Sequence, residues 1–321
     1  MSEKQQLFEQ SSQYRHWRFT PTSLAGLRAA NNRMGIERVL EGLKEEALVE
    51  GNAELAQTRL EEVQKNLLTP EDELRLIDYY LRKISDYANV YKFNNLVMAT
   101  AINFMKRFYL HNVVLDYPPK SIMLACLYLA TKVENSFLKI DDFTRPLARA
   151  KITNADVLDL EFVVTQSLQF ELCVHHPYRA AYGFFLDMQT HVEDIGVLQN
   201  TYDQAVKLIN KALFTDLVFF YQPAQIALGA FKLASLSTQC DIDNYLTSTF
   251  DARSLEMLYP ILDSVQDEIR RYTPVSVAEA QAVDRKLILC RNPEKNPNSK
   301  LYKKKVSDQG DVPYVSDSDS D

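Results

Sequence analysis

Glycine is scarce in this chain, and the turn signals of β structure are missing with it. Only 8 of 321 residues are glycine, which is well below the usual share of about 7 %. No Asn-Gly or Asp-Gly pair occurs, and these pairs are the strongest short-range signal of a β-hairpin. Hydrophobic residues still make up 46 % of the chain. We therefore expect an almost entirely helical protein with two domains of ordinary size and tails.

Sequence motifs of enzymes and cofactor sites are missing as well. The chain has no GxxxxGKS/T, GxGxxG, GxSxG or HExxH pattern, so nothing predicts a phosphate loop or a nucleophile. The four cysteines are far apart and lack zinc-ligand spacing, which favours free, buried thiols in a reducing compartment. His175 and His176 are adjacent and have no third ligand nearby. We expect no cofactor, no metal site and no catalytic residue.

Negative charge is concentrated at one end of the chain. The net charge is −7, and residues 306–321 contain five aspartates but no lysine or arginine. The remainder is close to neutral, whereas a nucleic-acid binder normally carries a basic face. The polar N-terminus does not resemble a signal peptide, and the apolar run Ile122–Ala130 is far shorter than the roughly 20 residues of a membrane span. We therefore expect neither direct nucleic-acid binding nor membrane insertion.

The segment PPKSIMLACLYLATKVE, residues 118–134, dominates the hydrophobic pattern. Every residue from Ile122 to Ala130 is apolar or small, which predicts a helix buried on all sides. The same pattern recurs 104 residues later in QPAQIALGAFKLASLST, residues 222–238. Because a solenoid unit is much shorter than this period, the repeat predicts two copies of a compact helical domain, each built around a buried central helix.

Helical periodicity and capping signals divide the rest of the chain. We expect an N-terminal arm and helical extension over 1–68, a first domain over 69–175 and a second over 176–273. A C-terminal helix follows over 274–291, opened by the capping box of Ser276 and Glu279, and a disordered acidic tail over 292–321. In the arm, YRHWRF at 14–19 holds the only tryptophan and either folds back on the body or docks on a partner.

A carboxylate interrupts the apolar stripe of the fifth helix predicted in the first domain. One face of this helix carries Val157, Glu161, Val164 and Leu168. Lys132 similarly extends the buried face of the central helix. Buried charges are costly unless they are paired or hydrogen-bonded. Either the two side chains pair inside the domain, with Lys132 also a favourable charge at a helix C-terminus, or both lie at the rim of a groove and meet a partner's polar backbone.

Two short motifs lie near the C-terminus. Ser316 and Ser318 each precede an aspartate by three residues, a spacing that suits phosphorylation by an acid-directed kinase, although the segment could also serve only solubility. The run of lysines at 303–305 is of the kind used in nuclear import, and such short runs also arise by chance.

These features together resemble the cyclin family. FMKRFYL at 104–110 and LYLATKVE at 127–134 resemble the first cyclin box of transcription-type cyclins, and Lys132 and Glu161 have the family's spacing of 29 residues. The resemblance implies an all-α fold of two tandem five-helix cyclin-box repeats flanked by N- and C-terminal helices. It also implies that Lys132 and Glu161 bind the main chain around the regulatory helix of a kinase. We assign to the same kinase-binding site their neighbours Val133, Glu134, Phe104, Val157 and Val164.

Within the family, the segments at 11–19, 175–187 and 214–228 most resemble H-type cyclins. The resemblance implies a non-catalytic nuclear subunit that activates a cyclin-dependent kinase, the catalytic subunit of a CDK-activating kinase. That kinase would act on other cyclin-dependent kinases and on the repeat tail of RNA polymerase II, with a RING-finger assembly factor and the TFIIH core as further partners. The alternatives are a C-type cyclin of the Mediator kinase and a TFIIB-like initiation factor. The latter would need a zinc ribbon and a basic DNA-facing surface.

Overall fold

The computed structural model describes residues 7–51, 53–150 and 152–310. Every regular element in these ranges is a helix, which confirms the all-α prediction. The chain packs as two compact units. The first unit contains the residues up to Ala25, Asp78–Phe108 and Lys120–Pro274, and the second contains Gly26–Ile77, Tyr109–Pro119 and the residues from Val275 on. No helix in the described ranges is long and apolar enough to cross a membrane.

Two tandem sets of five helices are present, with further helices on either side. The first repeat consists of α4 (Pro70–Val90), α5 (Asn95–Phe108), α6 (Pro119–Val133), α7 (Ile140–Thr144) and α8 (Asn154–Ser167). The second consists of α9 (Pro177–Met188), α10 (Ile195–Ala212), α12 (Pro223–Thr238), α13 (Ile242–Thr249) and α14 (Ala252–Arg271). The flanking helices are α1 (Ser12–His16), α2 (Pro21–Glu50), α3 (Ala53–Asn66), α15 (Val277–Cys290) and α16 (Lys300–Gly310). The short connecting elements are η1 (Leu7–Gln10), η2 (Arg145–Ala150), α11 (Leu217–Phe220) and η3 (Pro293–Lys295).

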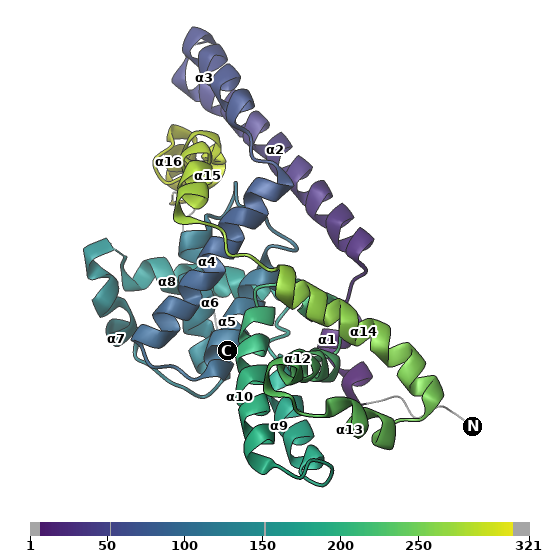
Figure 1. The fold of residues 1–321 in the computed structure, drawn as a ribbon. Coiled ribbons are helices and arrows are strands. Elements are labelled where there is room, and N and C mark those ends of the chain that lie inside the picture. Colours follow the sequence, from purple (N-terminus) through teal and green to yellow (C-terminus); the bar gives the residue numbers. More distant parts are fainter. Residues whose placement is uncertain (1–6, 52, 151, 311–321) are drawn as a thin grey trace, which may run out of the picture. The chain divides into compact units, whose positions relative to one another are not determined.

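The two predicted central helices are α6 and α12. All residues from Ile122 to Ala130 in α6 are at most 6 % exposed, so the helix has no solvent face, as its composition predicts. In the second repeat α12 contacts α9, α10, α13 and α14 (Figure 1). Gly229 of α12 permits the close approach of α14, since a Cβ atom there would lie 2.6 Å from Cγ1 of Val265. Each repeat is therefore organised around one buried helix.

The N-terminal arm folds back on the first unit. Trp17 is 2 % exposed, its Nε1 donates a hydrogen bond to Glu171 over 2.6 Å, and the guanidinium of Arg107 lies 5.0 Å from the centre of its ring. The backbone N–H of Phe19 donates to the carbonyl of Phe219 in the second repeat. The arm therefore folds back on the body, which is one of the two alternatives that the sequence left open. An isolated exposed tryptophan is unfavourable, and a buried one needs a partner for its N–H, which Glu171 provides here.

A buried lysine also joins the two repeats. Lys106 of α5 is 6 % exposed and its ammonium donates to the carbonyls of Leu213, over 3.1 Å, and of Thr215. These carbonyls follow the last residue of α10 and accept no hydrogen bond within that helix. Main-chain acceptors without helical partners thus satisfy a charge that would otherwise be costly to bury.

In the second unit the described residues after Cys290, up to 310, form helices where the sequence predicted disorder. The predicted disordered tail, 292–321, contains η3 and α16, and Leu301 is 3 % exposed. The side chain of Asn292 donates to Asp116 over 2.7 Å, and the N–H of Lys300 donates to Glu46 over 2.9 Å. The polar composition of this segment favours disorder locally, but contacts with residues remote in sequence hold it.

Candidate partner-binding site on the first repeat

Local sequence signals place Lys132 and Glu161 at defined positions on α6 and α8. Asn135 has a φ of 54°, a left-handed conformation that asparagine tolerates and that terminates helices, so α6 ends just after Lys132. Helix α8 begins with a capping box in which the hydroxyl of Thr153 accepts from the N–H of Asp156 and the carboxylate of Asp156 accepts from the N–H of Thr153. The helix ends at Ser167, because Gln169 and Phe170 also have positive φ values.

Lys132 and Glu161 form a salt bridge at the protein surface. The ammonium nitrogen of Lys132 lies 2.6 Å from Oε1 and 2.8 Å from Oε2 of Glu161. The side chains are 41 % and 15 % exposed, respectively, and the ammonium also lies 4.6 Å from the centre of the Tyr128 ring. The two side chains pair, as one alternative predicted, but they do so at the protein surface and not inside the domain. Because the pair is accessible, its geometry also leaves hydrogen-bonding capacity for a partner.

The neighbouring residues of the predicted site have different environments. Glu134 is half-buried and accepts a hydrogen bond of 2.6 Å from the hydroxyl of Thr100 on α5. Val133 is half-buried as well. Both lie at the end of α6 beside Lys132 and present part of their surface to solvent. They remain predicted contact residues.

Three residues assigned to the site are core residues. Phe104 and Val164 have no exposed surface, and Val157 is 1 % exposed. The expectation that they touch a partner is therefore corrected: their side chains point inward on α5 and α8 and determine how α8 packs. The apolar stripe that made them candidates is the buried face of the helix.

The sequence interpretation overlooked the outer face of α8. Leu158 is 39 % exposed and Phe162 is 64 % exposed. They are four residues apart and lie beside Glu161 on the helix surface. Phe137, in the segment that follows α6, is 77 % exposed. The sequence did contain a signal for this surface, namely large apolar residues outside the buried stripe of an amphipathic helix. Such residues expose apolar area that a partner can cover.

Thiols and metal-ligating side chains are the other groups that could carry chemistry. In the part of the chain that the structure describes, no group of three or more His, Cys, Asp or Glu side chains could hold a metal. Cys126, Cys240 and Cys290 are buried free thiols, whereas Cys173 is exposed, so the prediction of buried thiols holds for three of the four. Burial raises the pKa of the Cys126 thiol. The predicted phosphorylation sites, Ser316 and Ser318, lie outside the described residues.

Comparison with known families identifies both repeats. Residues 52–173 match the family described as Cyclin, N-terminal domain, and residues 176–273 match Cyclin C-terminal domain. The chain belongs to the cyclin family.

Three relatives indicate which cyclins this chain resembles. It is 36 % identical over 250 residues to Cyclin CCL1 of Saccharomyces cerevisiae, covering 77 % of this chain and 62 % of that protein. It is 33 % identical to Cyclin mcs2 of Schizosaccharomyces pombe, over 94 % and 91 % of the two chains, and 30 % identical to Cyclin-H of Xenopus laevis, over 71 % and 73 %.

Solved structures resemble this cyclin over most of its length. A chain in the CAK complex from Chaetomium thermophilum bound to ATP-gamma-S matches with a TM-score of 0.79 and 26 % identity, covering 98 % of this cyclin and 97 % of that chain. A chain in the yeast TFIIK (Kin28/Ccl1/Tfb3) complex matches with a TM-score of 0.64 and 32 % identity, over 81 % and 99 %. Because the first matched chain covers nearly the whole cyclin, the flanking helices belong to the shared fold as well as the repeats.

Proposed function

We propose that this cyclin is the non-catalytic regulatory subunit of a cyclin-dependent kinase that acts in transcription. The observation that carries the proposal is the accessible Lys132–Glu161 pair at the junction of α6 and α8. Its relatives CCL1 and Cyclin-H, and its likeness to chains of CAK and TFIIK complexes, support this choice over a C-type cyclin or a TFIIB-like factor.

The contact surface would combine polar and apolar recognition. Lys132 is a donor and Glu161 an acceptor, so together they can pair with a carbonyl and an N–H of a partner's main chain. Leu158 and Phe162 lie beside Glu161 and would cover apolar side chains of a kinase helix. Val133 and Glu134 extend this surface along the end of α6. An apolar patch with a charge pair at its edge gives affinity from burial and register from the polar contacts.

Activation follows from holding a kinase helix in place. Protein kinases are active only when an ion pair between a strand lysine and a glutamate of their regulatory helix is formed. A cyclin docked on that helix stabilises the conformation in which the pair exists, so the inactive arrangement becomes less populated. Phosphoryl transfer then belongs to the kinase, and this chain needs no catalytic residue of its own.

The remaining assignments extend the same proposal. The kinase would phosphorylate other cyclin-dependent kinases and the repeat tail of RNA polymerase II. A RING-finger assembly factor and the TFIIH core would complete the assembly, and the protein would work in the nucleus. Purification of the full chain from nuclear extract, with mass spectrometry of the bound proteins, tests all of these. A cyclin-dependent kinase with TFIIH subunits is expected; Mediator subunits would assign it to the C-type instead, and recovery without any kinase would overturn the proposal.

Charge reversal at Glu161 tests the contact surface directly. Glu161→Lys should weaken binding of the recovered kinase by about tenfold or more, because a repulsive charge then faces the partner and Lys132. The unfolding midpoint should change less than kinase binding does, because the pair lies at the surface and is partly exposed, and surface ion pairs contribute only about 0–1 kcal/mol to stability. Asp86→Lys is the matched control, because Asp86 also forms a surface salt bridge, with Lys83 of α4. Equal kinase binding by both variants would contradict the proposed surface.

A further inference from the structure

A surface groove with an apolar floor crosses the second repeat. It lies between α10, α12 and α14 and has a volume of about 460 Å³, and these three helices contact one another in pairs. Ligand sites typically have volumes of about 300–1,000 Å³. Ala234 and Ile269 in the groove are buried, and Leu208 and Leu233 are partly buried against the repeat's core. The groove therefore offers a partner apolar area to cover.

The charged side chains that line the groove are all basic. They are Lys207 and Lys211 of α10 and Arg270 of α14, and no acidic residue of the described chain lines it. Neither lysine forms a salt bridge with another described residue, whereas Arg270 makes a 3.3 Å contact with Asp267 of its own helix. Lys211 lies in the last turn of α10, where a positive charge stabilises the helix. Lys207 is exposed and lies one turn earlier, so helix stabilisation does not account for it.

An apolar floor with a basic margin selects the chemistry of its occupant. Carboxylates form charge-assisted hydrogen bonds with lysine and arginine, whereas a basic partner would meet like charges and be disfavoured. Single-stranded nucleic acid also carries negative charge, but its bases stack on aromatic side chains, and no aromatic residue of the described chain lines the groove. A helix with an apolar face and an acidic margin matches both halves of the surface, because such helices bind by placing the apolar face in a groove.

We propose that this groove docks an acidic amphipathic helix of a partner protein. The apolar side chains of that helix lie against Leu208 and Leu233, and its carboxylates face the three basic residues of the margin. The groove shares no residue with the proposed kinase surface, which lies on the first repeat. The second repeat is thus a separate interaction surface, and the inference stands whether or not the proposed kinase contact is correct.

The test measures binding of a fluorescent peptide, LEELLEELLEE, to the full-length chain by anisotropy. Its leucines fall on one face of a helix and its glutamates on the other. The control peptide, LQQLLQQLLQQ, has the same apolar face without the carboxylates. The acidic peptide should bind saturably and about tenfold more tightly than the control, because it alone can pair with the basic margin. No saturable binding, or equal affinity for the two peptides, would overturn the proposal.

Matched charge reversals locate the binding site. Lys207→Glu should weaken binding of the acidic peptide by about fivefold or more, as expected for loss of one attractive surface pair and gain of a repulsion. Arg253→Glu makes the same change of charge at an exposed position near the start of α14, far from Arg270 at its other end. It should leave binding unchanged at about 0.15 M salt, where charges are screened beyond about 8 Å. Equal weakening by both reversals would mean a general charge effect and would exclude the groove.

A pair of leucine truncations tests the apolar floor. Leu208→Ala removes apolar area from the groove and should weaken binding of the acidic peptide by about threefold or more. Leu236→Ala is the control, because Leu236 lies on α12, is 65 % exposed and does not line the groove. Wild-type affinity in Leu208→Ala would show that the floor takes no part and would exclude an amphipathic occupant. Since Lys207 is exposed, its reversal tests the same site without disturbing the core.

Discussion

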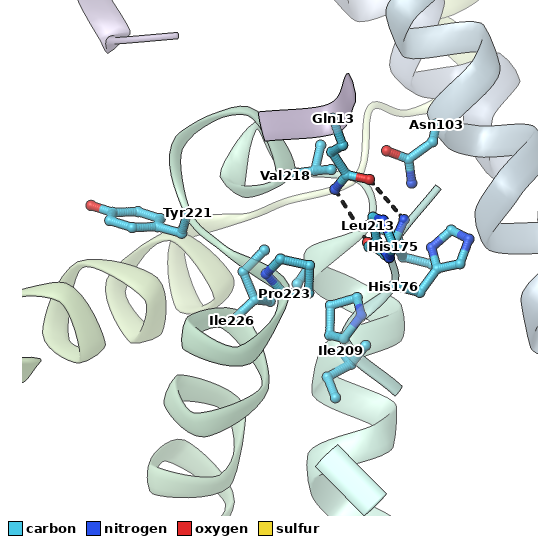
Figure 2. A pocket seen from close by; sticks show the side chains of 12 residues that line it. Gln13, Asn103, His175, His176, Ile209, Leu213, Val218, Tyr221, Pro223 and Ile226 are labelled. Carbon is cyan, nitrogen blue, oxygen red and sulfur yellow. Dashed lines mark hydrogen bonds between the residues drawn. The ribbon is translucent and has the colours of Figure 1, made fainter. Parts of the chain in front are cut away.

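At the level of single residues, a chain of hydrogen bonds determines which ring nitrogen of His176 carries the proton. Its Nε2 lies 2.7 Å from the hydroxyl oxygen of Thr100, and that hydroxyl donates to Glu134. The Thr100 oxygen must therefore accept from Nε2–H, which leaves Nδ1 as the unprotonated nitrogen. Nδ1 is buried without a hydrogen-bond partner in the described part of the chain. The His176 side chain lines a small pocket together with Gln13 and Asn103 (Figure 2).

The pKa of His176 makes stability depend on pH. Burial, followed by the nearby charges of Arg107 and His175, lowers its pKa to about 3, whereas in the unfolded chain it is about 6.5. Between these values the unfolded chain binds a proton that the folded chain does not, so stability is full above about pH 7 and falls as pH decreases. The loss at pH 5 should approach about 2 kcal/mol.

Urea unfolding at pH 7.5 and pH 5 measures this effect in the wild type and in His176→Gln. The variant should lose less stability on acidification, because glutamine does not titrate. His175→Gln provides the control, since His175 is an exposed neighbour and its replacement should retain most of the pH dependence. An identical fall in stability for wild type and His176→Gln would contradict the assignment.

At the scale of elements, the spacing of α12 and α14 depends on Gly229. A Cβ atom at this position would lie 2.6 Å and 2.8 Å from Cγ1 and Cβ of Val265, and a β-branched side chain has no freedom to move away. Gly229→Ala should therefore destabilise the protein by about 1–3 kcal/mol through overpacking, even though alanine favours helix. Adding Val265→Ala should restore part of this loss, as a double-mutant cycle in urea would measure; purely additive losses would exclude the clash.

Local sequence patterns explain which of the helices could be predicted. The buried central helices and the capping box of Ser276 are local patterns that the sequence predicted, and the structure contains all of them. Helix α16 was not predictable, because Asn292 and Lys300 are held by residues far away in the sequence. At the site, the charges of Lys132 and Glu161 on otherwise apolar helix faces predicted their pairing as one of two alternatives, and the two side chains do pair. Periodicity alone could not separate the buried face of α8, with Val157 and Val164, from the outer face with Phe162.

At the scale of the molecule, the two repeats of the first unit are linked by more than the connecting chain. The arm contacts the first repeat through Trp17 and the second through Phe19, while Arg18 donates to the carbonyl of Phe220 over 2.5 Å. Lys106 provides a second link from α5. If one repeat unfolded alone, the other would lose these contacts and would be less stable. We therefore expect the two repeats of the wild type to unfold in a single cooperative transition.

Removing the tryptophan should uncouple the repeats. Trp17→Ala deletes a side chain that is 2 % exposed and should cost about 3–5 kcal/mol, as truncation of buried aromatic residues does. Because the arm then loses its anchor between Arg107 and Glu171, its contacts with the second repeat should also weaken, and calorimetry should resolve two transitions. Trp17→Phe keeps an aromatic ring beside Arg107 but loses the hydrogen bond to Glu171 and part of the buried volume of the indole, so it should retain one transition with a smaller loss of stability. A single, merely lowered transition in Trp17→Ala would mean that the arm stabilises the first repeat without coupling it to the second.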